Sequence, residues 1–225
     1  MTPRRLLAID TSGTNALVAL GEADGTLLAE RRWLAGYRHG EELLTQIDEM
    51  LTAAGVALAG LSGIVVGTGP GAFTGLRVGL ATAKGLAHGL AIPLAGVATS
   101  EALLLAASLA GAIEGTKAAL LLPAGPSDRV VVIEGRASLL RGGEEPELDP
   151  ATTLVAVDLP NRAPAEALAL GQLAEAGLAA ALLRLGAGRI AAGGEDVARL
   201  VPEYVTLPRG VPVAKGEVRW SHDHR

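Results

Sequence analysis

The most informative part of this chain reads GTGPGAFTGLRVG, from Gly67 to Gly79. An apolar run, Ile64 to Val66, precedes this glycine string, and a stretch with helical character, Leu80 to Leu90, follows it. Glycines at a strand-to-helix turn let backbone N–H groups approach a ligand or another chain closely. The string therefore has three interpretations: a phosphate loop, a dinucleotide site or a protein interface.

The two nucleotide interpretations fit poorly. A Walker-type phosphate loop ends in Gly-Lys followed by Ser or Thr, whereas the only nearby lysine, Lys84, precedes Gly85 within the expected helix. The segment Gly67 to Ala72 formally fits the dinucleotide fingerprint, but no carboxylate follows where the ribose would need one. Pro70 also lacks the N–H that a pyrophosphate would accept from. The sequence therefore disfavours both sites.

The third interpretation starts from the helix that follows, which contains glycines at 75, 79, 85 and 89. Each interior glycine costs roughly 0.8–1 kcal/mol relative to alanine, so the helix gives up stability for close packing. The close neighbour is either the protein's own sheet or a second chain. Because each pair has i, i+4 spacing, we expect one small-residue face that admits a partner. On this hypothesis Gly79→Leu leaves the fold largely intact and weakens association.

Composition narrows the function classes. The chain has 225 residues, 49% of them hydrophobic, and a net charge of −5, which indicates a globular protein without an overall basic face for nucleic acid. Aromatic residues make up only 2%, so base-stacking platforms are not expected. With no cysteine, disulfides and thiolate zinc sites are excluded. We expect a cytoplasmic protein that is not bound to a membrane.

Hydrophobic periodicity predicts an α/β fold whose first half contains three strands and then helix, strand, helix and strand. The second half is expected to contain a short helix, four strands and a long Ala/Leu-rich helix. The expected strands are 6–9, 16–20, 26–33, 64–66, 92–97, 118–122, 129–133, 137–140 and 154–157, and the expected helices are 41–54, 75–90, 101–110 and 164–185. Thr99 or Ser100 is expected to cap the third helix.

Three segments together resemble the TsaB/YeaZ family. They are AIDTS from Ala8 to Ser12, HGE from His39 to Glu41 and GPGAFTGLRVG from Gly69 to Gly79, and the similarity continues through Ala87. The resemblance covers roughly residues 6–101, and Pro202 to Val205 resembles the last segment of the family.

The resemblance implies a two-lobed actin-like fold of the ASKHA, ribonuclease H-like type, with a mixed sheet and helices in each lobe. It implies an N-terminal lobe of residues 1–98, dimerisation helices at about 41–54 and 75–90, and a degenerate C-terminal lobe of residues 99–225 with a surface-wrapping tail. It further implies a non-catalytic scaffold that supports TsaD in forming N6-threonylcarbamoyladenosine in tRNA. The implied partners are TsaD, a second copy of the chain and, through the TsaB–TsaD complex, TsaE; tRNA is involved only indirectly.

The second lobe departs from the family pattern. Pro123-Ala124-Gly125 stands where the family usually has an Asp-Ala-Arg-like triplet, and Val157-Asp158-Leu159-Pro160 replaces a glycine-rich turn. These departures weaken the case for a nucleotide between the lobes. The alternative function from a different class is an actin-like, ATP-dependent small-molecule kinase or ATPase.

The residue pattern and the family resemblance together indicate candidate site residues. Asp10, Thr11 and Ser12 occupy the vestigial phosphate-loop position, although Asp and Ser are also ordinary turn formers. No two of the four histidines are spaced i, i+4, so we expect no metal site, and His222-Asp223-His224 is expected to be a polar tail. The resemblance implies that the chain has no catalytic residue, and we expect no cofactor. Phe73 is expected either in the core or at the interface. The predicted partner interface comprises His39, Glu41, Leu44, Ile47, Met50, Phe73, Thr74, Gly75, Arg77, Val78, Gly79, Thr82 and Ala83.

Overall fold

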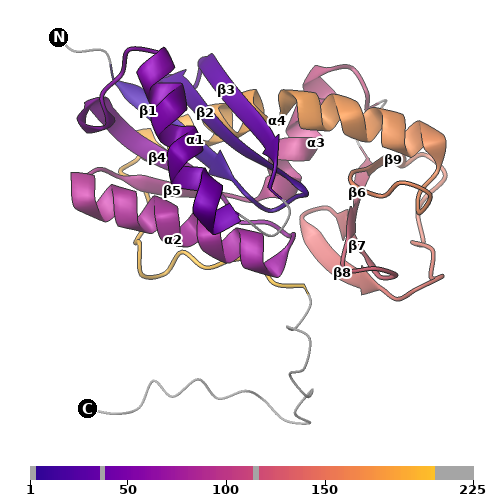
Figure 1. The fold of residues 1–225 in the computed structure, drawn as a ribbon. Helices are drawn as coiled ribbons and strands as arrows, with labels where there is room; N and C mark the ends of the chain where they lie inside the picture. The colour runs from indigo at the N-terminus through magenta and orange to yellow at the C-terminus, as the bar shows by residue number, and fades with distance from the viewer. Residues whose placement is uncertain (1–3, 36–38, 114–116, 206–225) are drawn as a thin grey trace.

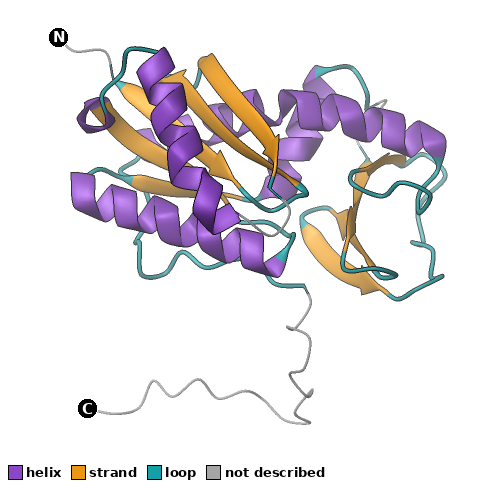
Figure 2. Ribbon diagram, viewed as in Figure 1, coloured by secondary structure: helices purple, strands orange, loops and turns teal. Residues whose placement is uncertain are grey.

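The structure is a computed structural model that describes residues 4–35, 39–113 and 117–205; of His39 it describes the backbone. Two sheets and four longer helices form two lobes (Figures 1 and 2). The predicted two-lobed, actin-like α/β architecture is confirmed. The elements of the first lobe are β1 Arg5–Asp10, β2 Asn15–Glu22, β3 Leu27–Leu34, α1 His39–Ala53, a 3-10 turn at Leu58–Gly60, β4 Leu61–Gly67, α2 Phe73–Leu90 and β5 Leu94–Val97. They are followed by α3 Thr99–Leu109, β6 Ala118–Pro123, β7 Arg129–Ile133, β8 Arg136–Leu140, β9 Thr153–Ala156 and α4 Ala165–Ala191.

The first sheet has the strand order β3-β2-β1-β4-β5. β1, β2 and β3 form the antiparallel meander that the sequence predicts, and Gly25 supplies the positive φ (90°) of the turn between β2 and β3. β4 and β5 are added in parallel after crossovers through α1 and α2. This mixed sheet brings the carboxyl ends of β1, β4 and β5 to one edge, where parallel α/β sheets place their ligand sites.

Both faces of this sheet are buried. Leu7 and Ile9 of β1 belong to the core that lies beneath α1 and α2, whereas Leu6 and Ala8 belong to the core shared with α3 and α4. In β4, Val66 belongs to the core beneath α1 and α2, and Val65 belongs to the core shared with α3 and α4. Strands buried on both sides are continuously apolar, which explains the unbroken runs in the sequence.

The second sheet has the order β8-β7-β6-β9, with β9 parallel to β6. The helix α4 runs behind the first sheet and on to the second lobe (Figure 1), and it packs against α3, against β9 and against all five strands of the first sheet. Close approach depends on small residues: a side chain at Gly186 would overlap Val65, and one at Gly171 would overlap the carbonyl of Ala156. α4 therefore joins the two lobes. Whether the lobes divide at residue 98 stays a prediction.

Among the described residues, α4 is the helix that combines great length with an apolar composition. By length and composition this helix could cross a membrane. In this structure it packs against α3 and against strands of both sheets.

One predicted helix cap is wrong. Ala98, which lies in an extended conformation, precedes the first residue of α3, and no side chain caps this end of the helix. Thr99 is instead inside the first turn, and its hydroxyl donates to the carboxylate of Asp10 (Oγ1 to Oδ2, 2.6 Å). The same hydroxyl accepts from the N–H of Gly69 (3.2 Å), so its donor and an acceptor position are both used in contacts with the first lobe.

Candidate functional site

The glycine string packs against the turn that follows β1. Thr11 Oγ1 donates to the carbonyl oxygen of Gly75 (2.7 Å), and the N–H of Ala72 donates to the carbonyl of Ser12 (2.7 Å). A side chain at Gly71 would overlap the carbonyl of Ser12. The string therefore lets the start of α2 lie directly on the Asp10 to Ser12 turn. Its close neighbour is this protein's own backbone.

The three residues predicted at the phosphate-loop position lie together and are buried. Asp10 Oδ1 accepts from the N–H of Ser12 (2.9 Å) and from its hydroxyl (2.7 Å), while Oδ2 accepts from Thr99. Gly67 leaves room for this carboxylate, since a β-carbon there would overlap Oδ2. Burial raises the pKa of Asp10 above its ordinary value of 3.8, and the hydrogen bonds from Thr99 and Ser12 oppose that shift. Both carboxylate oxygens are thus used within the chain.

The two lobes meet at this turn. Pro70 and Gly71 line a small cavity of about 20 Å³ together with Pro123 and Ala124 of the second lobe. On the other side of the turn, the N–H of Thr14 donates to Asp158 Oδ2 (2.8 Å). Sequence reasoning named the segment from Val157 to Pro160 only as a departure from the family pattern. It had no signal for this contact because 144 residues separate the partners.

The predicted single glycine face of α2 is wrong. Gly75 and Gly79 are buried, and a side chain at Gly79 would overlap the hydroxyl of Thr11. Gly85 and Gly89 are exposed, and a side chain at either would meet nothing within 4 Å. Six residues correspond to about 600° of helical rotation, so positions 79 and 85 point about 120° apart around the helix and do not share a face. Gly79 serves the fold of the chain itself, and the expectation that Gly79→Leu leaves the fold intact is wrong.

The other residues predicted for the interface fall into two groups. Ile47, Met50 and Ala83 are buried in the core beneath the two helices. The outward-facing group is exposed or half-buried and comprises Glu41, Leu44, Phe73, Thr74, Arg77, Val78 and Thr82. The side chain of His39 lies outside the described residues. A role in a partner interface stays a prediction for the outward-facing group.

Phe73 and Arg77 form a cluster with Tyr204. The rings of Phe73 and Tyr204 are 5.0 Å apart between centroids, and the Arg77 guanidinium carbon lies 3.9 Å from the Phe73 centroid. Arg77 Nε also donates to the hydroxyl of Tyr204 (2.9 Å). The C-terminal segment therefore reaches the N-terminal end of α2. Sequence reasoning placed Phe73 in the core or at the interface and left Tyr204 without a role.

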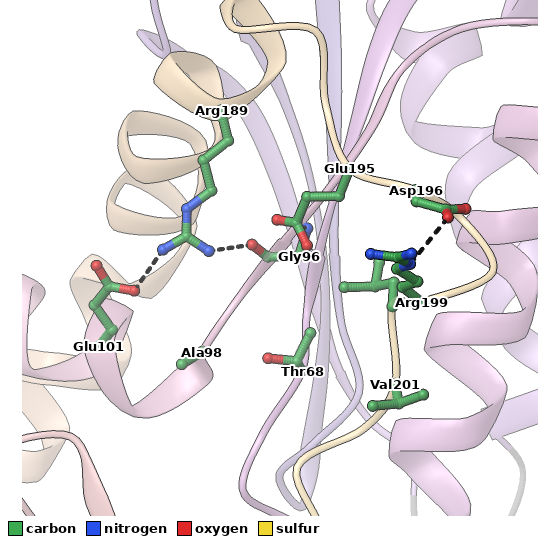
Figure 3. Close-up of a pocket in the computed structure, with 10 residues that line it drawn as sticks. Thr68, Gly96, Ala98, Glu101, Arg189, Glu195, Asp196, Arg199 and Val201 are labelled. Atoms are coloured by element: carbon green, nitrogen blue, oxygen red, sulfur yellow. Dashed lines mark hydrogen bonds and ion pairs between the residues drawn. The ribbon is translucent and has the colours of Figure 1, made fainter.

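A groove of about 550 Å³ lies at the carboxyl ends of β4 and β5 (Figure 3). Arg189 of α4 donates to the carbonyl of Gly96 and pairs with Glu101 Oε2 (2.8 Å). Glu195 accepts from the N–H of Gly96 (3.2 Å), and its own N–H donates to Leu94 O (2.8 Å). These contacts occupy the outward backbone groups of the edge strand β5, so the groove wall is closed to a further strand.

The part of the chain that the structure describes holds no cluster of three or more His, Cys, Asp or Glu side chains that could bind a metal ion. His222-Asp223-His224 lies outside the described residues. The candidate functional surfaces are therefore the turn between the lobes, the groove beside β5 and the outer face of α1 and α2.

Comparison with known proteins identifies relatives of the chain. A family model described as TsaD, tRNA N6-adenosine threonylcarbamoyltransferase, matches residues 33–204. The Escherichia coli protein named "tRNA threonylcarbamoyladenosine biosynthesis protein TsaB" is 40% identical over 95 residues, which is 42% of this chain and 40% of that protein. The Bacillus subtilis protein of the same name is 38% identical over 98 residues, which is 44% of this chain and 42% of that protein. The match thus spans less than half the length of these relatives.

Two solved structures share the fold. The structure titled "YeaZ from Pseudomonas aeruginosa" superimposes with a TM-score of 0.66 at 23% identity, over 89% of this chain and 99% of that one. A second Pseudomonas aeruginosa protein, described as similar to peptidase YeaZ, gives a TM-score of 0.68 at 24% identity, over 90% of this chain and 100% of that one. Because the family model covers most of the chain, this protein belongs to the tRNA N6-adenosine threonylcarbamoyltransferase family, and within it to the TsaB/YeaZ type that its sequence resembles.

Proposed function

We propose that this chain is a non-catalytic partner subunit in the biosynthesis of threonylcarbamoyladenosine in tRNA, and that it binds a TsaD-type catalytic subunit. The relatives named TsaB support a role in threonylcarbamoyladenosine biosynthesis. The outer face of α1 and α2 supports the proposal that the chain acts by binding another subunit. In this proposal TsaE joins through the complex, tRNA is contacted only through the complex, and the assembly is cytoplasmic.

The observation that carries the proposal is how charge is distributed over the two neighbouring helices. α1 carries acidic residues and no lysine or arginine, whereas α2 carries Arg77, Lys84 and His88 and no acidic residue. The acidic residues of α1 are Glu41, Glu42, Asp48 and Glu49. A partner with the same pair of helices could be related to this chain by a two-fold or pseudo-two-fold axis. The α2 of the partner would then lie against this α1, and this α2 would lie against the α1 of the partner. The face is thus complementary to a copy of itself and to a subunit built on the same fold.

Apolar and small residues on this face would provide the contact. Leu44 is 56% exposed, Val78 and Leu86 are half-buried, and Gly85 and Gly89 offer open space to an approaching helix. Burial of exposed apolar side chains such as Leu44 against a partner would contribute to the binding energy, by about 1.5–3 kcal/mol for a fully buried leucine. A specific interface buries about 1,200–2,000 Å² in total, which two helices from each partner can supply.

The kinase or ATPase alternative receives less support from the same structure. Both oxygens of Asp10 accept hydrogen bonds from within the chain. A phosphoryl-transfer site needs a carboxylate that is available to a metal ion. The geometry therefore favours the partner role.

The test compares Leu44→Glu with Leu109→Glu. Leu109 lies on α3 and is 58% exposed, so the two substitutions add the same charge at equally exposed leucines on different surfaces. Each variant is co-expressed with a TsaD-type subunit, and association is measured by pull-down and by light scattering after gel filtration. We expect Leu44→Glu to weaken binding at least about tenfold and Leu109→Glu to leave it unchanged, because only Leu44 would be buried against the partner.

Thermal unfolding of both variants alone serves as the control for folding. An unchanged complex with Leu44→Glu, or equal weakening by Leu109→Glu, contradicts the proposed surface. Micromolar ATP binding with phosphate release by the purified chain would reject the non-catalytic role.

A further inference from the structure

Arg77 is exposed on α2, yet its side chain is held in place from two sides. Its guanidinium carbon lies 3.9 Å from the centroid of the Phe73 ring, over the aromatic face. Its Nε donates to the hydroxyl of Tyr204 at 2.9 Å, and the two rings are themselves 5.0 Å apart between centroids. A free arginine loses rotamer freedom when it binds a partner, whereas this side chain is already ordered, so binding costs it less.

The tyrosine that holds Arg77 belongs to the C-terminal segment, which follows α4 and passes beside α2 (Figure 1). This segment is itself anchored. Leu200 is buried in the core beneath the two helices, and the N–H of Glu203 donates to the carbonyl of Thr68 at 2.8 Å. Tyr204 therefore reaches Arg77 from a fixed backbone, and the position of the guanidinium is set by two parts of the chain.

The terminal nitrogens of Arg77 are left for a partner group. Within residues 4–35, 39–113 and 117–205, no oxygen accepts from its Nη1 or Nη2, and no carboxylate forms an ion pair with it. A guanidinium presents such paired N–H groups to a carboxylate or a phosphate through two parallel hydrogen bonds. An ordered guanidinium with two free donor groups therefore fits an anionic group on another molecule.

We propose that Phe73 and Tyr204 hold Arg77 as a receptor for a carboxylate, and that the acidic first turn of α1 in a second copy of the chain supplies this carboxylate. The first-turn residue that we assign is Glu41, which is exposed. Arg77 makes the direct contact, and Tyr204 is a positioning residue. The assignment rests on the proposed function, because it takes the outer face of α1 and α2 as the partner surface.

The topology of the first sheet gives α1 and α2 the same direction. β3, β4 and β5 run parallel to one another, α1 connects β3 to β4, and α2 connects β4 to β5. Both helices therefore begin at the carboxyl edge of the sheet. A two-fold axis that runs along the helices places this α2 against the α1 of the second copy, with the two starts together. Arg77, near the start of α2, then lies opposite Glu41, near the start of α1.

The spacing of charges along the two helices supports this pairing. Arg77 and Lys84 are seven residues apart on α2. Glu41 and Asp48 are seven residues apart on α1. Seven residues correspond to about two turns and about 10.5 Å, so each pair lies along one side of its helix at the same spacing. When Arg77 lies opposite Glu41, Lys84 therefore lies opposite Asp48.

A phosphate of RNA would fit the same guanidinium but not its surroundings. α1, which packs beside α2, carries four acidic residues and no lysine or arginine, and the whole chain has a net charge of −5. An RNA backbone that approached Arg77 would be repelled by these carboxylates. The same carboxylates in a second copy are attracted, so the charges favour a protein partner.

The experiment measures self-association of the full chain by sedimentation equilibrium for Arg77→Glu, Glu41→Arg and the double charge swap. A two-fold dimer contains the ion pair twice, so each substitution acts twice. We expect either single change to weaken association at least about tenfold, and the double swap to associate at least about threefold more tightly than Arg77→Glu. Arg136→Glu, at an exposed arginine on β8 in the second lobe, is the matched control and should leave association unchanged.

Tyr204→Phe isolates the positioning role, because it removes the hydroxyl and keeps the ring. We expect it to weaken self-association about threefold in the wild-type background and to have no effect in Glu41→Gln, where Arg77 has no carboxylate to receive. A hydroxyl with a merely structural role would cost the same in both backgrounds. Arg77→Lys keeps the charge but not the paired donors, and it should also weaken association. Thermal unfolding of each variant checks its fold.

The second-copy assignment is overturned if the wild-type chain stays monomeric at about millimolar concentration, if Arg136→Glu weakens association as much as Arg77→Glu, or if the double swap recovers nothing. It is also overturned if Arg77→Glu weakens binding to a TsaD-type subunit and leaves self-association unchanged. Equal cost of Tyr204→Phe in the two backgrounds overturns the positioning role. None of these results depends on Leu44→Glu, which tests the proposed function with the TsaD-type subunit.

Discussion

The hydroxyl group of Thr11 fills the space beside Gly79 into which a side chain at position 79 would extend. The same hydroxyl donates to the carbonyl of Gly75, one turn earlier in α2. One threonine in the turn after β1 thus fixes both the position and the glycine requirement of a helix that begins more than sixty residues later in the chain.

The first prediction concerns the two kinds of glycine in α2. Gly79→Ala should lower the free energy of unfolding by about 1–3 kcal/mol, because the new methyl group overlaps Thr11 in a closed space. Gly85→Ala should raise it by about 0.5–1 kcal/mol, because its β-carbon meets nothing and alanine is the better helix former. Urea unfolding of both variants measures the difference.

A double-mutant cycle checks the cause. Thr11→Ala combined with Gly79→Ala should cost less than the sum of the single changes, because the first removes the atom with which the second collides. Strict additivity would show that the loss at position 79 has another origin.

The second prediction concerns Asp10 and pH. Burial raises the pKa of this carboxyl in the folded protein above the ordinary 3.8, so the folded state keeps the proton to higher pH than the unfolded chain. The contribution of Asp10 to stability is therefore largest below about pH 4 and declines as pH rises through the folded-state pKa. The asparagine side chain in Asp10→Asn does not ionise, so this variant lacks the pH-dependent contribution. Its stability relative to wild type should rise between about pH 4 and neutral pH, as measured by urea unfolding at several pH values.

Asp10→Ala is the companion variant. It leaves the N–H and hydroxyl of Ser12 and the hydroxyl of Thr99 without their acceptor, which should cost about 1–3 kcal/mol. Parallel pH profiles for the wild type and Asp10→Asn would argue against a raised pKa at Asp10.

The third prediction concerns the protected edge of β5. Arg189 and Arg199 both line the groove, but only Arg189 donates to the backbone of Gly96; Arg199 contacts Asp196 at 3.5 Å and is highly exposed. Arg189→Ala should lower the free energy of unfolding by about 1–2 kcal/mol, since it uncovers a carbonyl on an edge strand. Arg199→Ala should stay within about 0.5 kcal/mol of wild type, as exposed ion pairs usually do.

Hydrogen exchange supplies a local measurement for the same pair. Amides of β5 and of residues 195–201 should exchange faster in Arg189→Ala than in Arg199→Ala, because the side chain of Arg189 connects α4 to this edge. Equal exchange in the two variants would show that Glu195 alone protects the strand.

The secondary structure could be predicted from the sequence in its kinds and its order. Runs such as Ile64 to Val66 and the stripe of α1 from Leu43 to Leu51 lie where apolar period and run length indicate a strand and a helix. The ends were less accurate: α4 continues to Ala191, six residues beyond the expected end at 185. It passes through Gly186 and Gly188 although glycine often ends a helix, and Gly186 lets α4 lie close against Val65.

The site could be predicted only where local pattern carries the information. The turn residues Asp10 to Ser12 were named correctly as a cluster, since the turn itself brings them together. The single glycine face was wrong: the two glycine pairs are six residues out of step, so positions 79 and 85 lie about 120° apart around the helix, and only Gly75 and Gly79 are buried. The contact between Thr14 and Asp158 had no local signal at all.

The sequence by itself therefore determined the strands, the helices, the apolar faces and the family resemblance, because these depend on residues close together in the chain and on two short periods. Only the tertiary structure decided what each polar group meets: Thr11 meets α2, Thr99 meets Asp10, and Asp158 meets Thr14. The reason is physical. A buried donor or acceptor must find a partner, but the partner is selected by the packing of both lobes around α4, and no local rule of sequence encodes that packing.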